Sequence, residues 1–285
     1  MERLLVDCLV EQFPAASRQT LKRMAEAGRV LVNDRPVRKL KTALGPDDRV
    51  RVIDHGPVHG AAKASPPVPI IHEDDDVLVV NKPPGLLTST VPRERRPTLA
   101  AQLRNYTATS AGPRIRLGVI HRLDRDASGL LVFSKNNQAY ESLKSQFARH
   151  TVTRVYLAAV RGVPDPPAGR IESQLAERAD GSVHSSPNPT AGQRAITDYQ
   201  VVRDNGRAAL VRVTLHTGRK HQIRVHLSER GTPVLGDRIY DPHGGKLPAG
   251  RLMLAAVLLE FDHPRTGRRM CFELPPPKEL TAAAG

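Results

Sequence analysis

Apolar residues along the chain fall into short runs that predict more strands than helices. Short continuous apolar runs are typical of buried strands, and strict alternation is typical of strands with one buried face. These patterns predict strands over residues 76–81, 130–134, 151–160 and 209–216. Apolar residues at helical spacing predict helices over residues 18–27, 137–149 and 220–230. Because strands outnumber helices, we expect an α+β fold around a mostly antiparallel sheet.

The pattern within residues 1–53 predicts a small N-terminal unit. Ser17 is a suitable N-cap for its helix, and Gly28 suits the left-handed position that follows the helix. Two short apolar segments, separated by a turn at residues 33–36, follow. This unit is therefore expected to combine a helix with short paired strands.

A linker and a larger unit come next along the chain. Residues 54–67 are rich in Gly, Ala and Pro without apolar periodicity, which predicts a flexible linker. The second unit is expected over residues 68–280, followed by a short tail at 281–285. Within it, residues 179–192 are rich in Ser, Pro, Gly and Asn and are predicted as an exposed loop.

The charge balance indicates a polyanionic partner. Lys and Arg total 43 against 29 Asp and Glu, which gives a net charge of +14. An excess of this size is typical of nucleic-acid binding. Aromatic residues make up only 4%, which favours recognition of folded RNA by shape and phosphate over stacking of many bases. The first unit concentrates basic residues that we expect to bind RNA: Arg18, Lys22, Arg23, Arg29, Arg35, Arg38, Lys39 and Lys41.

Other features of the sequence exclude several classes of protein. No apolar stretch is long enough to span a membrane and no signal peptide is recognisable, so we expect a cytoplasmic protein without a membrane partner. Cys8 and Cys271 are expected to be free thiols. His216, His221 and His226 are spaced by five residues, which places them on no common face, so no metal site is expected. The chain is expected to act as a monomer.

The residues between Gly118 and Leu130 form the densest group of reactive side chains. Apolar segments precede and follow a polar loop that holds two carboxylates, two arginines and a histidine. Loops held between buried segments commonly present catalytic groups. An exposed turn with a few ion pairs is the alternative interpretation.

The segment His121–Lys135 (HRLDRDASGLLVFSK) resembles the signature of the RluA-type pseudouridine synthases. In that family the Asp after His-Arg-Leu is the essential catalytic residue, and here it is Asp124. Further blocks resemble the family's other motifs in the same order. These three blocks are residues 72–87, residues 154–162, and residues 215–227 together with residues 231–237 and Tyr240. The resemblance implies a pseudouridine synthase fold and an RNA-modifying isomerase.

Residues 1–53 resemble the S4 RNA-binding domain, which often precedes this catalytic domain. Two departures from the family pattern stand in the second unit. Ala127 occupies a position where the family usually has Thr, and residues 88–97 lack the usual short His-Pro ending. Neither removes a catalytic group, and the second affects the expected substrate more than the expected activity.

The resemblance implies a role for each residue of the expected site. Arg224 pairs with Asp124 and keeps it ionised, Tyr156 stacks on the target uracil, and Arg122 fills the space that a flipped-out uridine leaves. From the residues alone, Tyr156 is an ordinary core residue, Arg224 a helix-surface arginine and Arg122 a partner of Asp126. No cofactor is expected, because the reaction is an isomerisation.

The expected substrate is structured RNA, and an attached S4-like domain favours large-subunit ribosomal RNA over transfer RNA by family analogy. A non-catalytic RNA-binding or ribosome-assembly protein is a second hypothesis, and an enzyme of free pyrimidine nucleotides is a third. A carboxylate facing RNA phosphates is of no use to a pure binder, which speaks against the second. A free-nucleotide enzyme would have no use for the basic first unit.

Overall fold

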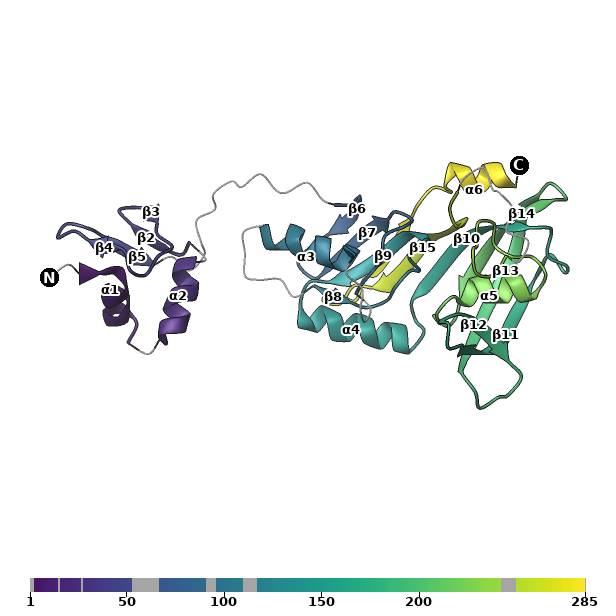
Figure 1. Cartoon of the computed structure of the whole chain (residues 1–285), viewed down its shortest axis with the longest axis horizontal. Helices are drawn as coiled ribbons and strands as arrows, with labels where there is room; N and C mark the ends of the chain where they lie inside the picture. The colour runs from purple at the N-terminus through teal and green to yellow at the C-terminus, as the bar shows by residue number, and fades with distance from the viewer. Residues whose placement is uncertain are drawn as a thin grey trace. The chain divides into compact units, whose positions relative to one another are not determined.

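The computed structural model describes residues 3–14, 16–26, 28–52, 67–90, 96–109, 117–241 and 250–284. The chain forms two compact units, which are described separately below (Figure 1). The predicted linker lies outside the described residues except for its last residue, Pro67. No helix in the described ranges is long and apolar enough to cross a membrane.

The first unit packs two helices with short strands. Its elements are β1 (Arg3–Leu4), α1 (Leu5–Gln12), α2 (Arg18–Glu26), β2 (Val30–Val32), β3 (Arg35–Pro36), β4 (Ala43–Leu44) and β5 (Val50–Val52). Strand β2 pairs antiparallel with β3 and β5. The predicted N-cap of α2 is confirmed, because Ser17 Oγ accepts from the Thr20 N–H at 3.2 Å. Gly28 follows the helix with φ of 69°.

The turn predicted at residues 33–36 is confirmed for Asn33 and Asp34, whereas Arg35 and Pro36 form β3. Asn33 and Asp34 have φ of 48° and 62° and connect β2 to β3. Two successive left-handed residues match the twist of a tight hairpin. Leucines and valines from both helices and β2 form the buried core of the unit: Leu5, Leu9, Leu21, Val30 and Val32.

The second unit is built around one large sheet. Its strands are β6 (Ile70–Glu73), β7 (Val77–Lys82), β8 (Gly118–Val119), β9 (Ser128–Ser134), β10 (Thr153–Arg161), β11 (Ala168–Glu177), β12 (Val183–Ser186), β13 (Gln193–Asp204), β14 (Ala208–Leu215), β15 (Leu254–Asp262) and β16 (Arg269–Glu273). Its helices are α3 (Leu99–Thr109), α4 (Asn137–Ala148), α5 (Gln222–Glu229) and α6 (Lys278–Ala283). Within the described residues, the sheet has 11 strands in the order β12-β11-β13-β14-β10-β15-β9-β7-β6, with β16 on β15 and β8 on β9.

Every strand pair of this sheet is antiparallel except β9 with β15. The predicted α+β fold around a mostly antiparallel sheet is therefore confirmed. The parallel pair meets at Gly129, where a Cβ atom would lie 2.1 Å from the Ala256 carbonyl oxygen. Only glycine permits this approach. Helix α4 packs against β8, β9 and β15, and α5 packs against β12 and β13 (Figure 1).

Strand β10 is buried on both faces, whereas the alternation in its sequence predicts one buried face. Elements that pack over the sheet, α6 among them, cover this strand, whereas its sheet neighbours β14 and β15 pair along its edges. The predicted loop at 179–192 is wrong in part, since β12 pairs there with β11.

One boundary of each of two predicted elements also differs from expectation. The helix predicted from residue 220 begins at Gln222, because His221 is left-handed with φ of 55°. The predicted tail at 281–285 is not separate, since α6 extends to Ala283 and Ala284 is buried. Cys8 and Cys271 are free thiols, as predicted.

Candidate active site

Asp124 lies on the loop between β8 and β9, and the backbone on both sides of it is anchored. Thr88 Oγ1 donates to the Leu123 carbonyl at 2.9 Å and accepts from the Leu123 N–H at 3.3 Å. Lys82 Nζ donates to the Arg125 carbonyl at 2.9 Å. These bonds hold the residue before Asp124 and the residue after it, so the carboxylate has a defined position.

Lys82 is a fully buried lysine whose ammonium group anchors this loop. Besides Arg125, it donates to the carbonyls of Pro83 at 3.0 Å and Leu86 at 2.8 Å. Three carbonyls match the three donors of an ammonium group. Burial lowers the pKa of Lys82 to about 8, and the nearby carboxylates of Asp126 and Asp124 oppose that shift. We regard the three carbonyl acceptors as a further reason why the protonated form is retained at neutral pH.

Arg224, on α5, connects Asp124 to a second carboxylate. Its Nη1 donates to Asp124 Oδ2 at 2.9 Å, while Nε and Nη2 form a bidentate pair with Asp237 at 2.7 and 2.8 Å. Burial opposes the charge on Arg224, but Asp237 and Asp124 outweigh it and raise the pKa of Arg224 above its ordinary value. The guanidinium is thus held by Asp237 and presents one nitrogen to Asp124.

Asp237 is a site residue that the sequence analysis did not single out. It is buried, and its Oδ1 also accepts from the backbone N–H groups of Ile239 and Tyr240. Although burial would raise the pKa of Asp237, Arg224 and these N–H groups lower it. The one signal for Asp237 in the sequence is its place in residues 231–237, which resemble a family motif. Its pairing with Arg224 depends on the fold, so no local pattern indicates it.

His221 and Tyr240 lie beside the ion pair. The Tyr240 hydroxyl accepts from the Val183 N–H at 2.8 Å and lies 2.7 Å from His221 Nδ1. When the hydroxyl donates to Nδ1, the His221 proton stays on Nε2, 4.0 Å from Asp124 Oδ2. Burial lowers the pKa of His221, which favours this neutral form. A neutral N–H group therefore faces the carboxylate from α5.

Asp124 opens onto a cleft of about 650 Å³. Residues from the loop, from β10 and from the start of α5 line it, among them Arg122, Asp124, Tyr156, Leu215, Arg224 and Leu254. Tyr156 is 6% exposed, and burial raises its pKa, so its hydroxyl is protonated at neutral pH. The cleft combines the Asp124 carboxylate, the rings of Tyr156 and Phe147, several cationic side chains and aliphatic walls.

The structure brings together the three residues expected to be catalytic, Asp124, Tyr156 and Arg224, in this cleft. Arg122 is exposed at the same cleft. The alternative in which Arg122 pairs with Asp126 is not observed, since Asp126 pairs with Arg125 at 3.0 Å. The alternative of a surface Arg224 is wrong, because this residue is buried.

The basic residues expected to bind RNA all belong to the first unit, and the cleft residues all belong to the second. Their side chains are exposed, except that Arg29 is half-buried and the side chain of Arg23 lies outside the described part of the structure. Lys22 pairs weakly with Glu26 at 3.8 Å. The other exposed cations expected to bind RNA are Arg18, Arg35, Arg38, Lys39 and Lys41.

The histidines considered as metal ligands have other partners. His216 lies 2.6 Å from Asp198, and His226 lies 2.8 Å from Thr197 Oγ1 and 3.0 Å from Ser173 Oγ. Together with the His221–Tyr240 contact, these bonds separate the three side chains into different networks.

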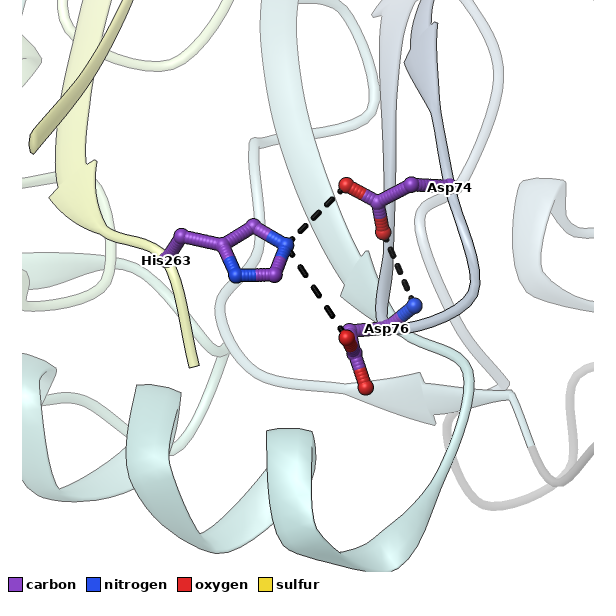
Figure 2. Close-up of side chains that lie close together, drawn as sticks. All are labelled: Asp74, Asp76 and His263. Atoms are coloured by element: carbon purple, nitrogen blue, oxygen red, sulfur yellow. Dashed lines mark hydrogen bonds and ion pairs between the residues drawn. The ribbon is translucent and has the colours of Figure 1, made fainter. Parts of the chain in front are cut away.

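A different group of ligand-type side chains, Asp74, Asp76 and His263, joins the β6–β7 turn to the end of β15 (Figure 2). His263 Nδ1 accepts from the backbone N–H groups of Arg265 and Thr266 at 3.2 Å, so its proton is on Nε2, 3.1 Å from Asp74. Asp76 is paired with Arg265 at 2.7 and 2.9 Å. Hydrogen bonds within the chain thus satisfy this cluster, which connects two turns of the sheet.

Comparison with known proteins identifies the family. The family profile described as RNA pseudouridylate synthase matches residues 76–229, and the S4 domain profile matches residues 3–50. The chain is 37% identical to the uncharacterized RNA pseudouridine synthase YlyB of Bacillus subtilis, over 93% of this chain and 87% of that protein. It is 33% identical to the ribosomal large subunit pseudouridine synthase D of Neisseria meningitidis, over 95% of this chain and 75% of that protein.

A solved structure supports the same assignment. Human RNA Pseudouridylate Synthase Domain Containing 4 aligns with a TM-score of 0.63 and 26% identity, over 75% of this chain and 91% of that chain. The fold, the ordered motifs and the relatives that match most of this chain agree. The chain therefore belongs to the RluA-type family of RNA pseudouridine synthases and carries an N-terminal S4 domain.

Proposed function

We propose that the chain converts selected uridines of large-subunit ribosomal RNA to pseudouridine, with Asp124 as its catalytic carboxylate. The observation that carries this proposal is the arrangement around Asp124. Its carboxylate is 24% exposed in a cleft, and it is paired at 2.9 Å with an arginine that a second carboxylate holds from behind. A structural ion pair has no need of an anchored loop or an adjoining cleft.

The chemistry requires an ionised carboxylate next to the sugar and base. The C1′–N1 bond of uridine breaks, the uracil turns, and C5 bonds to C1′; the C5 proton leaves and N1 gains a proton. A carboxylate assists by adding to the sugar or the base, or by stabilising positive charge at C1′. In each route the hydrogen bond from Arg224 Nη1 fixes the position of the Asp124 carboxylate.

Tyr156 and Arg122 are proposed to handle the nucleotide itself. A uridine in a helix or loop must leave the base stack to reach the cleft. The buried ring of Tyr156 offers an apolar face for the uracil, and its position at the cleft that holds Asp124 supports this role. Arg122 is exposed at the cleft and has no ion-pair partner within the described residues, so it is free to enter the vacated space.

Two features support ribosomal RNA as the substrate. Relatives that cover most of this chain are named ribosomal large subunit pseudouridine synthase D, in Neisseria meningitidis and in Zymomonas mobilis. The S4 domain adds a basic surface with which to bind structured RNA. Transfer RNA is the alternative substrate. Mapping pseudouridines in cells with and without this chain distinguishes the two, since the missing sites identify the RNA.

Asp124→Asn tests the proposed catalytic residue. The amide keeps the size and polarity of the carboxylate but loses its charge and nucleophilicity. We expect tritium release from C5-labelled uridine in RNA to stop, while RNA affinity changes little. Asp126→Asn is the matched control, because Asp126 pairs with Arg125 at the surface. Turnover retained in Asp124→Asn, or lost equally in both variants, would contradict the assignment.

A further inference from the structure

Arg154, on β10, is a buried cation that has no hydrogen-bond or ion-pair partner within the described structure. It is 8% exposed, and its Nε atom is completely buried without a hydrogen-bond acceptor. No carboxylate is among the groups that act on its charge. Because a buried charge is unfavourable unless it is paired, Arg154 has unused capacity to bind an anion from outside the chain.

The end of the Arg154 side chain faces the same cleft as Asp124. Arg154 lines this cleft, and its terminal nitrogens have no partner in the described residues but remain accessible to solvent. The guanidinium carbon lies 5.4 Å from the centroid of the Phe147 ring, on which His121 stacks at 4.6 Å. These rings support the guanidinium in one orientation without neutralising it.

Gly218, in the segment between β14 and α5, leaves the space that the guanidinium occupies. A Cβ atom at this position would lie 2.5 Å from Arg154 Nη1. The backbone of Gly218 is not in the left-handed region, so an alanine is tolerated there if the end of Arg154 moves. Gly218 thus determines where Arg154 lies without contributing a group of its own.

The surroundings of Arg154 are positively charged. Burial lowers the pKa of Arg154, and the charge of Arg219 lowers it further. Arg219 also lines the cleft, and its Nε donates to a backbone carbonyl, that of Arg194, at 3.0 Å. Arg154 and Arg219 have no counter-ion among the described residues, and two neighbouring cations of this kind attract an anion to this end of the cleft.

We propose that Arg154, with Arg219 beside it, binds a phosphate of the RNA next to the uridine held at Asp124. This inference rests on the proposed function, since it assumes that the cleft takes a nucleotide of an RNA strand. A flipped nucleotide carries a phosphate on each side, and a guanidinium fork matches phosphate oxygens. The contact positions the nucleotide and is independent of base identity.

The test uses a synthetic RNA hairpin that carries one uridine mapped as a target in cells. A single methylphosphonate, placed either 5′ or 3′ of this uridine, removes the charge of one phosphate. We expect one of the two placements to raise the KM of the wild-type protein about tenfold or more, as for removal of a hydrogen bond to a charged group. Arg154→Gln should raise KM similarly on unmodified RNA and should show no added loss on the sensitive methylphosphonate RNA.

Arg212→Gln is the matched control, because Arg212 is exposed on the neighbouring strand β14 and does not line the cleft. It removes the same charge and should keep full sensitivity to the methylphosphonate. Gly218→Ala is the second variant and should weaken this sensitivity by displacing the guanidinium, even if Arg154→Gln does not fold.

The outcomes separate this inference from the proposed function. A wild-type protein that is indifferent to both methylphosphonates overturns the phosphate contact, including the case in which Arg154 binds a base carbonyl instead. Undiminished sensitivity in Arg154→Gln or Gly218→Ala overturns it as well. Failure of the wild-type protein to release tritium from any unmodified RNA contradicts the proposed function itself.

Discussion

Replacing Thr88 by Val would test whether the anchored backbone beside Asp124 is needed for turnover. Thr88 is 2% exposed, and its hydroxyl bonds both the N–H and the carbonyl of Leu123. Valine has nearly the same shape but no hydroxyl, so both backbone groups lose their partner. Each unsatisfied buried group costs about 1–3 kcal/mol, which gives about 2–6 kcal/mol if the loop keeps its position.

The loop can instead move until water satisfies these groups. The loss of stability is then smaller, but Asp124 shifts with the loop, and small misplacements of a reacting group reduce turnover strongly. We therefore expect Thr88→Val either to lower the unfolding free energy by at least about 2 kcal/mol or to lower turnover at least about tenfold. RNA affinity should remain near that of the wild type.

Thr88→Ser is the control, because it keeps the hydroxyl and removes one methyl group, a loss of about 1 kcal/mol. Urea unfolding measures the stability of both variants, and single-turnover tritium release measures the chemical step. If Thr88→Val matches Thr88→Ser in both measurements, the hydrogen bonds to Leu123 do not position the catalytic loop.

Three further predictions concern other parts of the chain. Burial lowers the pKa of His226 to about 4 from 6.5, so its neutral form stabilises the fold above pH 6.5. That stability should be lost as the pH falls toward 4, by up to about 3 kcal/mol. Urea unfolding at several pH values should show that the unfolding free energy of His226→Gln falls less steeply with decreasing pH than that of the wild type. An equal pH dependence in both proteins would refute this. Arg224→Met should lower the unfolding free energy by about 3–5 kcal/mol because Asp237 stays buried without its partner; a wild-type melting temperature would contradict that. Removal of residues 1–53 should make the slope of log RNA affinity against log salt concentration shallower by roughly 0.7–0.9 for each phosphate that the S4 domain binds. An unchanged slope would mean that the basic residues of this domain do not bind phosphates.

Local patterns predicted much of the fold, and the resemblance of four ordered blocks supplied the expected site. Ser17 capping α2 and Gly28 ending it depend only on neighbouring residues, so the sequence was sufficient for them. The placement of β12 and the left-handed conformation of His221 depend on distant pairing and packing. No local pattern carries that information.

The interactions that support Asp124 were the least predictable part of the site. Thr88 precedes Leu123 by 35 positions, and Lys82 precedes Arg125 by 43. Each residue is unremarkable in sequence, because a buried hydroxyl or ammonium group acquires its role only through the carbonyl it meets. Thr88 also opens the segment that departs from the family pattern, and in this chain it has a structural role on the catalytic loop.

The position of β15 has a consequence for synthesis of the protein on the ribosome. Strands β6 to β9 form one half of the sheet, and strands β10 to β14 form the other. Strand β15 follows all of them in the chain, yet it lies between β10 and β9 and connects the two halves. Asp124 lies on the loop that leads into β9, in the first half, and Arg224 lies in α5, which follows β14 of the second half. Within the described residues, β15 is the only strand that pairs with both halves. A nascent chain that has not released residue 262 from the ribosome can form both halves but cannot bring them together. The enzyme should therefore acquire its ion pair, and with it any activity, only after β15 has left the ribosome.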